Sequence, residues 1–114
     1  MNDDTFLKKG FAISTDKDLL DIGLIHAYLS GESYWAKNMP LETLKRSVEN
    51  SLCFGIYQQN KQVGFGQVIT DKATFAYIGN VFVLNEFRGL GLSKWLMQTM
   101  LEHTELQNLL CPLS

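Results

Sequence analysis

The most informative segment of this chain is residues 80–94, which read NVFVLNEFRGLGLSK. An apolar run rich in valine and phenylalanine is typical of a β-strand. Two glycines follow the run, and apolar residues then recur at helical spacing. The segment therefore predicts a strand, a glycine turn and a helix that begins directly from the turn.

The glycine turn is a candidate anion site. Gly89 and Gly91 let the backbone N–H groups approach a ligand without a Cβ in the way. The first turn of the helix leaves further N–H donors unpaired at the positive end of the helix dipole. Together these groups suit a diphosphate, with Arg88 as a cationic neighbour. Glycines also merely turn a chain between a strand and a helix, so the pattern alone leaves both interpretations open.

Two other phosphate motifs do not fit this segment. The dinucleotide-binding motif has a third glycine and a strand–helix–strand crossover, whereas this segment has two glycines and follows consecutive strands. A Walker loop requires a lysine directly after a glycine, and Lys94 does not follow one. The sequence therefore predicts a different kind of phosphate-binding turn.

Three strands are expected before the turn, over residues 52–57, 62–70 and 74–84. They are rich in aromatic and branched residues, and polar turns at 59–61 and 71–73 separate them, so an antiparallel meander is predicted. Gly79 lies inside the third strand. It indicates a β-bulge that splays the strand from its neighbour, although close backbone packing also explains a glycine there.

The N-terminal half predicts a short strand at residues 11–14 and two helices. Thr15 is placed as the N-cap of the first helix, which has an apolar face to about residue 30 and ends at Gly31. Pro40 suits the first turn of the second helix. The last helix is expected over residues 90–102, with a buried side made of Leu92, Trp95, Leu96 and Met100.

Composition limits the function classes. The chain has 114 residues, 46% of them hydrophobic, and a net charge of -2, which suits one domain and argues against nucleic-acid or anionic-membrane partners. Cys53 and Cys111 lie far apart and form no metal motif, so no metal site is predicted. The N-terminus does not resemble a secretion signal, and no apolar run reaches the roughly 20 residues that span a bilayer. We therefore expect a cytoplasmic protein.

On these residues the chain resembles the GNAT superfamily of N-acetyltransferases, and especially a small bacterial branch of it. The family's glycine motif, Gln/Arg-x-x-Gly-x-Gly/Ala, overlays residues 86–91, with Glu86 in place of Gln or Arg. The resemblance covers about residues 11–110. It implies one GNAT-like domain over residues 1–114 with an α+β, three-layer fold, in which helices cover both faces of a mostly antiparallel sheet of about four strands.

The resemblance also implies acetyl-coenzyme A as co-substrate and a primary amine of a small molecule or peptide as acceptor. The backbone of Val81, Phe82 and Val83 would bind the pantetheine arm, and the Val81 N–H would stabilise the oxyanion. Tyr34 and Trp35, in the loop between the first two helices, are candidate substrate contacts or part of a lid on the core. The remaining expected cofactor contacts are Arg88, Gly89, Leu90, Gly91, Leu92 and Ser93.

Members of the superfamily continue beyond the cofactor helix with a further strand that lines the pantetheine slot and a segment that usually supplies the general acid. Few residues follow Leu110 here, so we expect a C-terminally incomplete domain without an assignable general acid. The exposed edge of the strand at 74–84 then predicts a homodimer. Tyr77 and Asn80 are polar candidates, each better explained by packing or hydrogen bonding, and His26 and His103 are expected to be structural.

Two alternatives to an enzyme stay open. The chain could be a coenzyme A binding module or sensor with impaired catalysis, or an interaction domain whose glycines only turn the chain.

Overall fold

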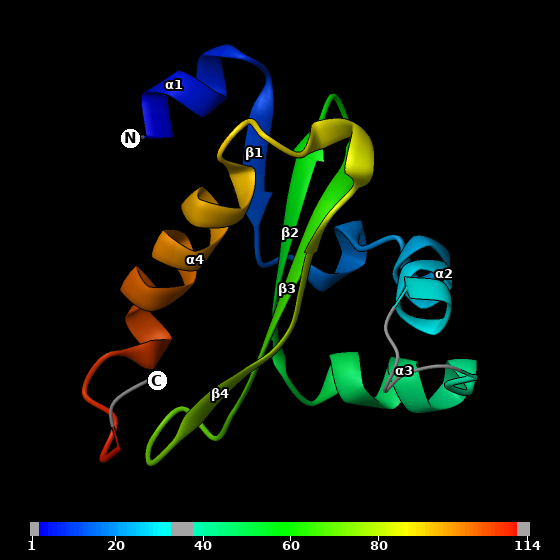
Figure 1. Cartoon of the computed structure of the whole chain (residues 1–114). Coiled ribbons are helices and arrows are strands. Elements are labelled where there is room, and N and C mark those ends of the chain that lie inside the picture. The colour runs from blue at the N-terminus through cyan, green and yellow to red at the C-terminus, as the bar shows by residue number, and fades with distance from the viewer. Residues whose placement is uncertain (1–2, 33–37, 112–114) are drawn as a thin grey trace.

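The computed structural model describes residues 3–32 and 38–111 and contains one antiparallel sheet, with strand order β1-β2-β3-β4 (Figure 1). The four strands are β1 (Phe11–Ser14), β2 (Leu52–Gln58), β3 (Lys61–Thr70) and β4 (Ala76–Val83). The meander of three strands and the short first strand are therefore confirmed.

Helices cover both faces of the sheet, which confirms the predicted three layers (Figure 1). Helices α1 (Asp3–Lys8) and α4 (Leu92–Glu102) lie on one face, and α2 (Ile22–Glu32) and α3 (Leu41–Glu49) lie on the other. Three short 3₁₀ turns, η1 (Lys17–Leu19), η3 (Asn85–Phe87) and η4 (Thr104–Leu106), complete the described elements. No helix in the described ranges is both long and apolar enough to cross a membrane.

The core follows the alternation of the strands. In β2, Phe54 and Ile56 belong to the cluster under α4, whereas Cys53 belongs to the cluster under α2 and α3. Phe6 of α1 stacks on Trp95 of α4, with ring centroids 4.4 Å apart. Helix α1 was not predicted, because a helix of six residues carries little periodic pattern.

Helix α4 lies very close to β3, and a glycine permits this contact. A Cβ added at Gly66 would stand 2.8 Å from the Met100 sulfur and 3.2 Å from Leu96 Cδ2. Any larger residue would require the Met100 and Leu96 side chains to shift. This close packing positions the N-terminus of α4 beside the end of β4.

The β-bulge predicted at Gly79 is confirmed. Gly66 pairs with Val81, but Val68 pairs with Ile78, so Gly79 and Asn80 of β4 together face the single residue between Gly66 and Val68. The bulge separates the outer half of β4 from the half that leads into the glycine turn.

Several predicted boundaries were wrong, and local hydrogen bonds explain them. Asp16, not Thr15, is an N-cap, and it begins η1 because its carboxylate accepts from the Asp18 amide at 3.0 Å. Helix α2 begins only at Ile22 and continues through Gly31. Helix α4 begins at Leu92 instead of residue 90, because Gly91 is its left-handed N-cap.

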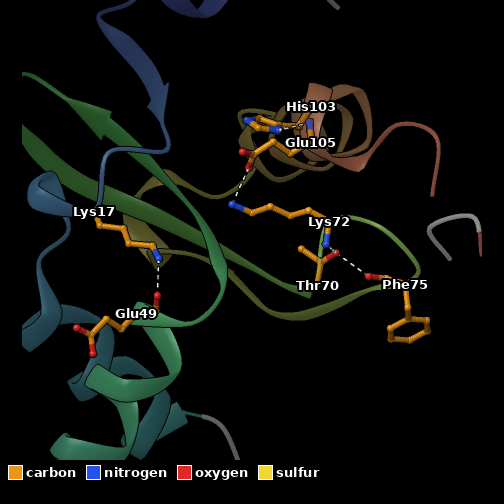
Figure 2. A network of polar contacts seen from close by, with 7 residues as sticks. All are labelled: Lys17, Glu49, Thr70, Lys72, Phe75, His103 and Glu105. Carbon is orange, nitrogen blue, oxygen red and sulfur yellow. Dashed lines mark hydrogen bonds and ion pairs between the residues drawn. The ribbon is translucent and has the colours of Figure 1, made fainter. Parts of the chain in front are cut away.

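The third strand begins at Ala76, not at residue 74, because a side-chain turn holds the β3–β4 hairpin. The Asp71 carboxylate accepts from the amides of Ala73 and Thr74 at 2.9 and 2.8 Å. Lys72 extends from the hairpin to Glu105 of η4 at 3.2 Å, and Figure 2 shows this ion pair together with the His103 contact that caps η4. The hairpin is thus attached to the segment that follows α4.

Candidate functional site: a glycine loop, an open strand edge and a pocket at the bulge

A pocket of about 290 Å³ lies where β4 passes into α4, and we call it the loop pocket. The glycine turn, the first turn of α4 and two cationic side chains line it. Its lining consists of Val83, Phe87, Arg88, Gly89, Gly91, Leu92, Ser93 and Lys94.

Both glycines of the turn adopt a backbone conformation that other residues rarely adopt. Gly89 has φ 83° and Gly91 has φ 88°, both in the left-handed region. Gly91 caps α4 without a side-chain hydrogen bond, and the first amide bonded into the helix is that of Trp95, which donates to the Gly91 carbonyl at 3.1 Å. In the described part of the chain, the amides of residues 89–94 have no recorded acceptor. These donors are available to an anion.

The Arg88 side chain links this turn to β4 and α2 by hydrogen bonds. Its Nε donates to the Val83 carbonyl at 3.2 Å, and its second terminal nitrogen, Nη2, donates to the Tyr28 hydroxyl at 2.6 Å. Tyr28 in turn stacks on Phe82 at 4.0 Å. The guanidinium therefore connects β4, the glycine turn and α2, and places a positive charge at the loop pocket.

Lys94 is a second cation in the lining, and the sequence analysis did not propose it as a cofactor contact. It lies in the first turn of α4 and is exposed. Its position close after the glycine turn was the signal that could have identified it. Glu86, which replaces the Gln or Arg of the family motif, is exposed and does not line the pocket.

The β4 edge that faces away from β3 carries outward backbone groups. The Leu84 amide donates to the Val63 carbonyl at 2.9 Å, so this pair is a hydrogen-bonded pair of the ladder. Because such pairs alternate, Phe82 is bonded to β3, whereas the N–H and C=O groups of Val81 and Val83 face away from it. The Arg88 contact to the Val83 carbonyl agrees with this direction. No described strand pairs with this edge.

A second pocket, of about 480 Å³, lies against the bulge of β4, and we call it the bulge pocket. Its last lining residue on β4, Asn80, precedes Val83 of the loop pocket by three residues, which is about 10 Å along the strand. Its lining comes from the segment before α3, from α3, β3 and β4: Met39, Thr43, Leu44, Ser47, Gln67, Ile69, Tyr77, Gly79 and Asn80.

A chain of side-chain hydrogen bonds runs behind the bulge pocket. Asn80 donates to Gln67 Oε1 at 2.7 Å, and Gln67 Nε2 donates to the hydroxyls of Ser47 and Ser51 at 2.7 and 2.8 Å. Gln67 is buried, with 1% of its surface exposed. These hydrogen bonds could not be predicted from the sequence, because the residues that form them are far apart along it.

The other predicted residues are placed as follows. Leu90 is exposed and lies outside the lining of the loop pocket. Tyr34 and Trp35 lie outside the described residues. His26 contacts the Met39 carbonyl at 2.7 Å, and His103 accepts from the Glu105 amide at 3.1 Å, so both histidines have the expected structural contacts.

Comparison with known proteins identifies the family. Residues 23–110 match the model of the acetyltransferase (GNAT) family. The chain belongs to this family. The match includes β4, the glycine turn and the whole of α4, which together form the loop pocket.

Individual relatives agree with this family. A GNAT-family protein of Xanthomonas campestris pv. campestris is 51% identical, with a TM-score of 0.87 over 91% of this chain and 72% of its own. A protein of Gibberella zeae named as an acetyltransferase is 32% identical over 81% of this chain, and the chain spans 63% of that curated relative's length. A GNAT-family structure from Elizabethkingia anophelis with acetyl-CoA bound is 14% identical and has a TM-score of 0.58 over 80% of this chain and 55% of its own, a likeness of fold alone.

Proposed function

We propose that this GNAT-family chain binds acetyl-coenzyme A and transfers the acetyl group to a primary amine of a small molecule or peptide. One observation carries the proposal: the amides of residues 89–94, which lack acceptors within the described chain, lie next to the outward backbone groups of β4. The diphosphate of the cofactor would bind the amides at the loop pocket, and its pantetheine arm would bind the outward groups along the β4 edge.

The cofactor is expected to contact a continuous set of backbone groups. The diphosphate accepts from the amides of residues 89–94, with the cations of Arg88 and Lys94 beside it. The pantetheine arm then pairs with the outward groups of Val81 and with the N–H of Val83, whose carbonyl already accepts from Arg88. The backbone of Phe82 is bonded to β3, so it does not pair with the arm as the resemblance to the family implied. Its buried ring packs under α2.

The chemical step is a direct attack. The amine lone pair forms a C–N bond with the thioester carbonyl carbon, and the carbonyl electrons move to oxygen, where the Val81 N–H donates to the oxyanion. A single well-placed donor of this kind contributes about 3–4 kcal/mol to transition-state stabilisation. When the carbonyl re-forms, the C–S electron pair leaves with sulfur, the surplus amine proton passes to water, and the thiolate takes a proton from water. We assign no general acid among the described residues.

A thiol-release assay with acetyl-coenzyme A and a panel of amines tests this function. Turnover with at least one amine is expected, and a matched titration calorimetry experiment should show binding of coenzyme A. Binding without turnover across a broad panel would favour a binding module or sensor over an enzyme. Absence of both would favour an interaction domain.

The expected homodimer remains a proposal. The β4 edge is open in the described chain, and an unpaired apolar edge favours pairing with another strand. A partner strand along Val81 and Val83 would occupy the groups proposed for the pantetheine arm, so we expect the dimer to pair along the outer half of β4. Tyr34 and Trp35 as substrate contacts, and a cytoplasmic location, also stay predictions.

A further inference from the structure

Among the residues that the structure describes, the polar side chains that line the bulge pocket are all neutral. Thr43 and Ser47 contribute hydroxyls, Gln67 and Asn80 contribute carboxamides, and Tyr77 contributes a phenol. The rest of the described lining is apolar or glycine. An ammonium group that entered this pocket would lose its hydration without gaining a carboxylate from the described lining, which is unfavourable.

The charged side chains of α3 do not line this pocket. Glu42 and Lys45 pair with each other at 3.7 Å, and both are exposed. Arg46 and Glu49 are exposed as well. Helix α3 presents only Thr43, Leu44 and Ser47 to the pocket, so its charges cannot form a direct contact with a bound amine there.

The hydrogen bonds behind the pocket have a fixed direction. The Ser51 hydroxyl donates to the Ser47 carbonyl at 2.7 Å, so its oxygen accepts from Gln67 Nε2. This turns Gln67 Oε1 toward Asn80, which must offer its Nδ2. The Asn80 Oδ1 atom is left as an acceptor, and it has no recorded donor among the described residues.

A carboxamide oxygen accepts a hydrogen bond from an amine but does not remove a proton from an ammonium ion. Asn80 directly precedes Val81, whose N–H is proposed to hold the thioester oxygen, and the two residues are about 3.3 Å apart along the strand. The Asn80 oxygen and the reacting carbonyl would therefore be close neighbours.

We infer that the bulge pocket selects acceptor amines that are uncharged at neutral pH, with Asn80 Oδ1 accepting from one N–H of the nucleophile. This inference rests on the proposed acetyl transfer. The amine must arrive with its lone pair free, because the described lining contains no carboxylate or imidazole to deprotonate it. Weakly basic amines, of which arylamines are one class, are the substrates that this pocket accepts.

Two isomeric amines test the selectivity. At pH 7, 4-methylaniline is neutral and benzylamine is cationic. The wild-type chain should acetylate 4-methylaniline with a kcat/KM at least about tenfold higher than that for benzylamine. Asn80→Asp introduces a carboxylate of the same shape and should shift the ratio toward benzylamine by about tenfold or more. Asn60→Asp adds the same charge at the exposed β2–β3 turn and should leave the ratio unchanged.

Preferred turnover of benzylamine by the wild-type chain, or an unchanged ratio in Asn80→Asp, would overturn the selectivity and leave acetyl transfer standing. If neither amine is acetylated, the broad amine panel decides whether the chain transfers acetyl groups at all. The selectivity would then be decided by NMR titration of both amines, followed on the Asn80 side-chain amide: tighter binding of 4-methylaniline supports it, and tighter binding of benzylamine overturns it.

Discussion

Gly91 combines a left-handed backbone with a position at the proposed diphosphate site. Its φ of 88° is unfavourable for any residue with a Cβ, by roughly 1–2 kcal/mol. Gly91→Ala should therefore lower the free energy of unfolding by about 1 kcal/mol and weaken acetyl-coenzyme A binding. Urea unfolding and titration calorimetry measure the two effects.

Gly31→Ala is the matched control for this substitution. Gly31 lies inside α2, and a Cβ added there meets nothing within 4 Å. The alanine should keep or raise the stability, by about 0.5–1 kcal/mol, because it favours the helix. Equal behaviour of the two variants would contradict the role assigned to the turn.

Tyr57 has a buried hydroxyl without a hydrogen-bond partner in the described structure. Burial, with smaller contributions from the charges of Asp16 and Cys53, raises its pKa from 10.0 to about 12. Between these values the folded chain keeps the proton while the unfolded chain releases it. The free energy of unfolding should therefore fall as the pH rises from 10 to 12.

Tyr57→Phe should remove the part of the fall in the free energy of unfolding above pH 10 that the Tyr57 hydroxyl causes. Because it also removes an unpaired buried hydroxyl, it should raise the free energy of unfolding at pH 7 by about 1 kcal/mol. Denaturant unfolding at pH 7 and above pH 10 compares the variant with the wild-type chain. A lower stability at pH 7 would show that the hydroxyl has a partner after all.

At this scale the sequence identified the backbone part of the site and the Arg88 side chain, but not the side-chain contacts between distant segments. Gly89, Gly91 and Gly79 could be assigned because positive φ and bulges have strong local preferences. The contact of Asn80 with Gln67 could not, because residues 13 apart are brought together only by the strand register. Tyr28 was predicted as part of an apolar helix face, and its bond to Arg88 depends on the packing of α2 against β4.

Among the elements, the β3–β4 hairpin depends on one charged side chain. The Asp71 carboxylate accepts from the Thr74 hydroxyl at 2.6 Å and from the Thr74 and Ala73 amides, and these bonds hold its pKa well below the usual range. The stabilisation is present above the unfolded pKa of about 3.9 and is lost as the pH falls through the lower, folded pKa.

Asp71→Asn should therefore lower the melting temperature at pH 7, and the difference from the wild-type chain should shrink as the pH falls below about 4. Thermal unfolding followed by circular dichroism from pH 7 to pH 2 measures this. Asp18→Asn, on the exposed η1 turn, serves as the control. A pH-independent difference would mean that the charge of Asp71 does not hold the turn.

Element boundaries were predicted well where the apolar periodicity is strong and poorly where several neighbouring polar residues could each cap a helix. The bounds of β1 agree with the expectation, and β2 and β3 are each longer than expected by only one residue. Near η1, Ser14, Thr15 and Asp16 are all able to cap a helix. The hydrogen bond from the Asp18 amide to the Asp16 carboxylate, at 3.0 Å, makes Asp16 the cap in the folded chain, and no residue pattern indicates it.

For the whole molecule, the three layers were predicted from the resemblance to the GNAT superfamily, and the apolar faces of α2, α3 and α4, which pack on the two sides of the sheet, agree with that prediction. The oligomeric state belongs to this scale. Light scattering of the purified chain should give the mass of a dimer, and added acetyl-coenzyme A should leave that mass unchanged if pairing uses the outer half of β4. A monomer mass would contradict the dimer, and dissociation by the cofactor would show that both compete for the edge at Val81.

The central claim is that the free amides of the glycine turn and the outward amide of Val81 bind one molecule of acetyl-coenzyme A. NMR titration of the ¹⁵N-labelled chain tests it most directly, since it reports each amide separately. Saturating acetyl-coenzyme A should shift the amides of Gly89, Gly91, Ser93 and Val81, while that of Lys72, in the β3–β4 turn at the opposite end of β4, stays unchanged. Unshifted amides at the turn and at Val81 would contradict the claim.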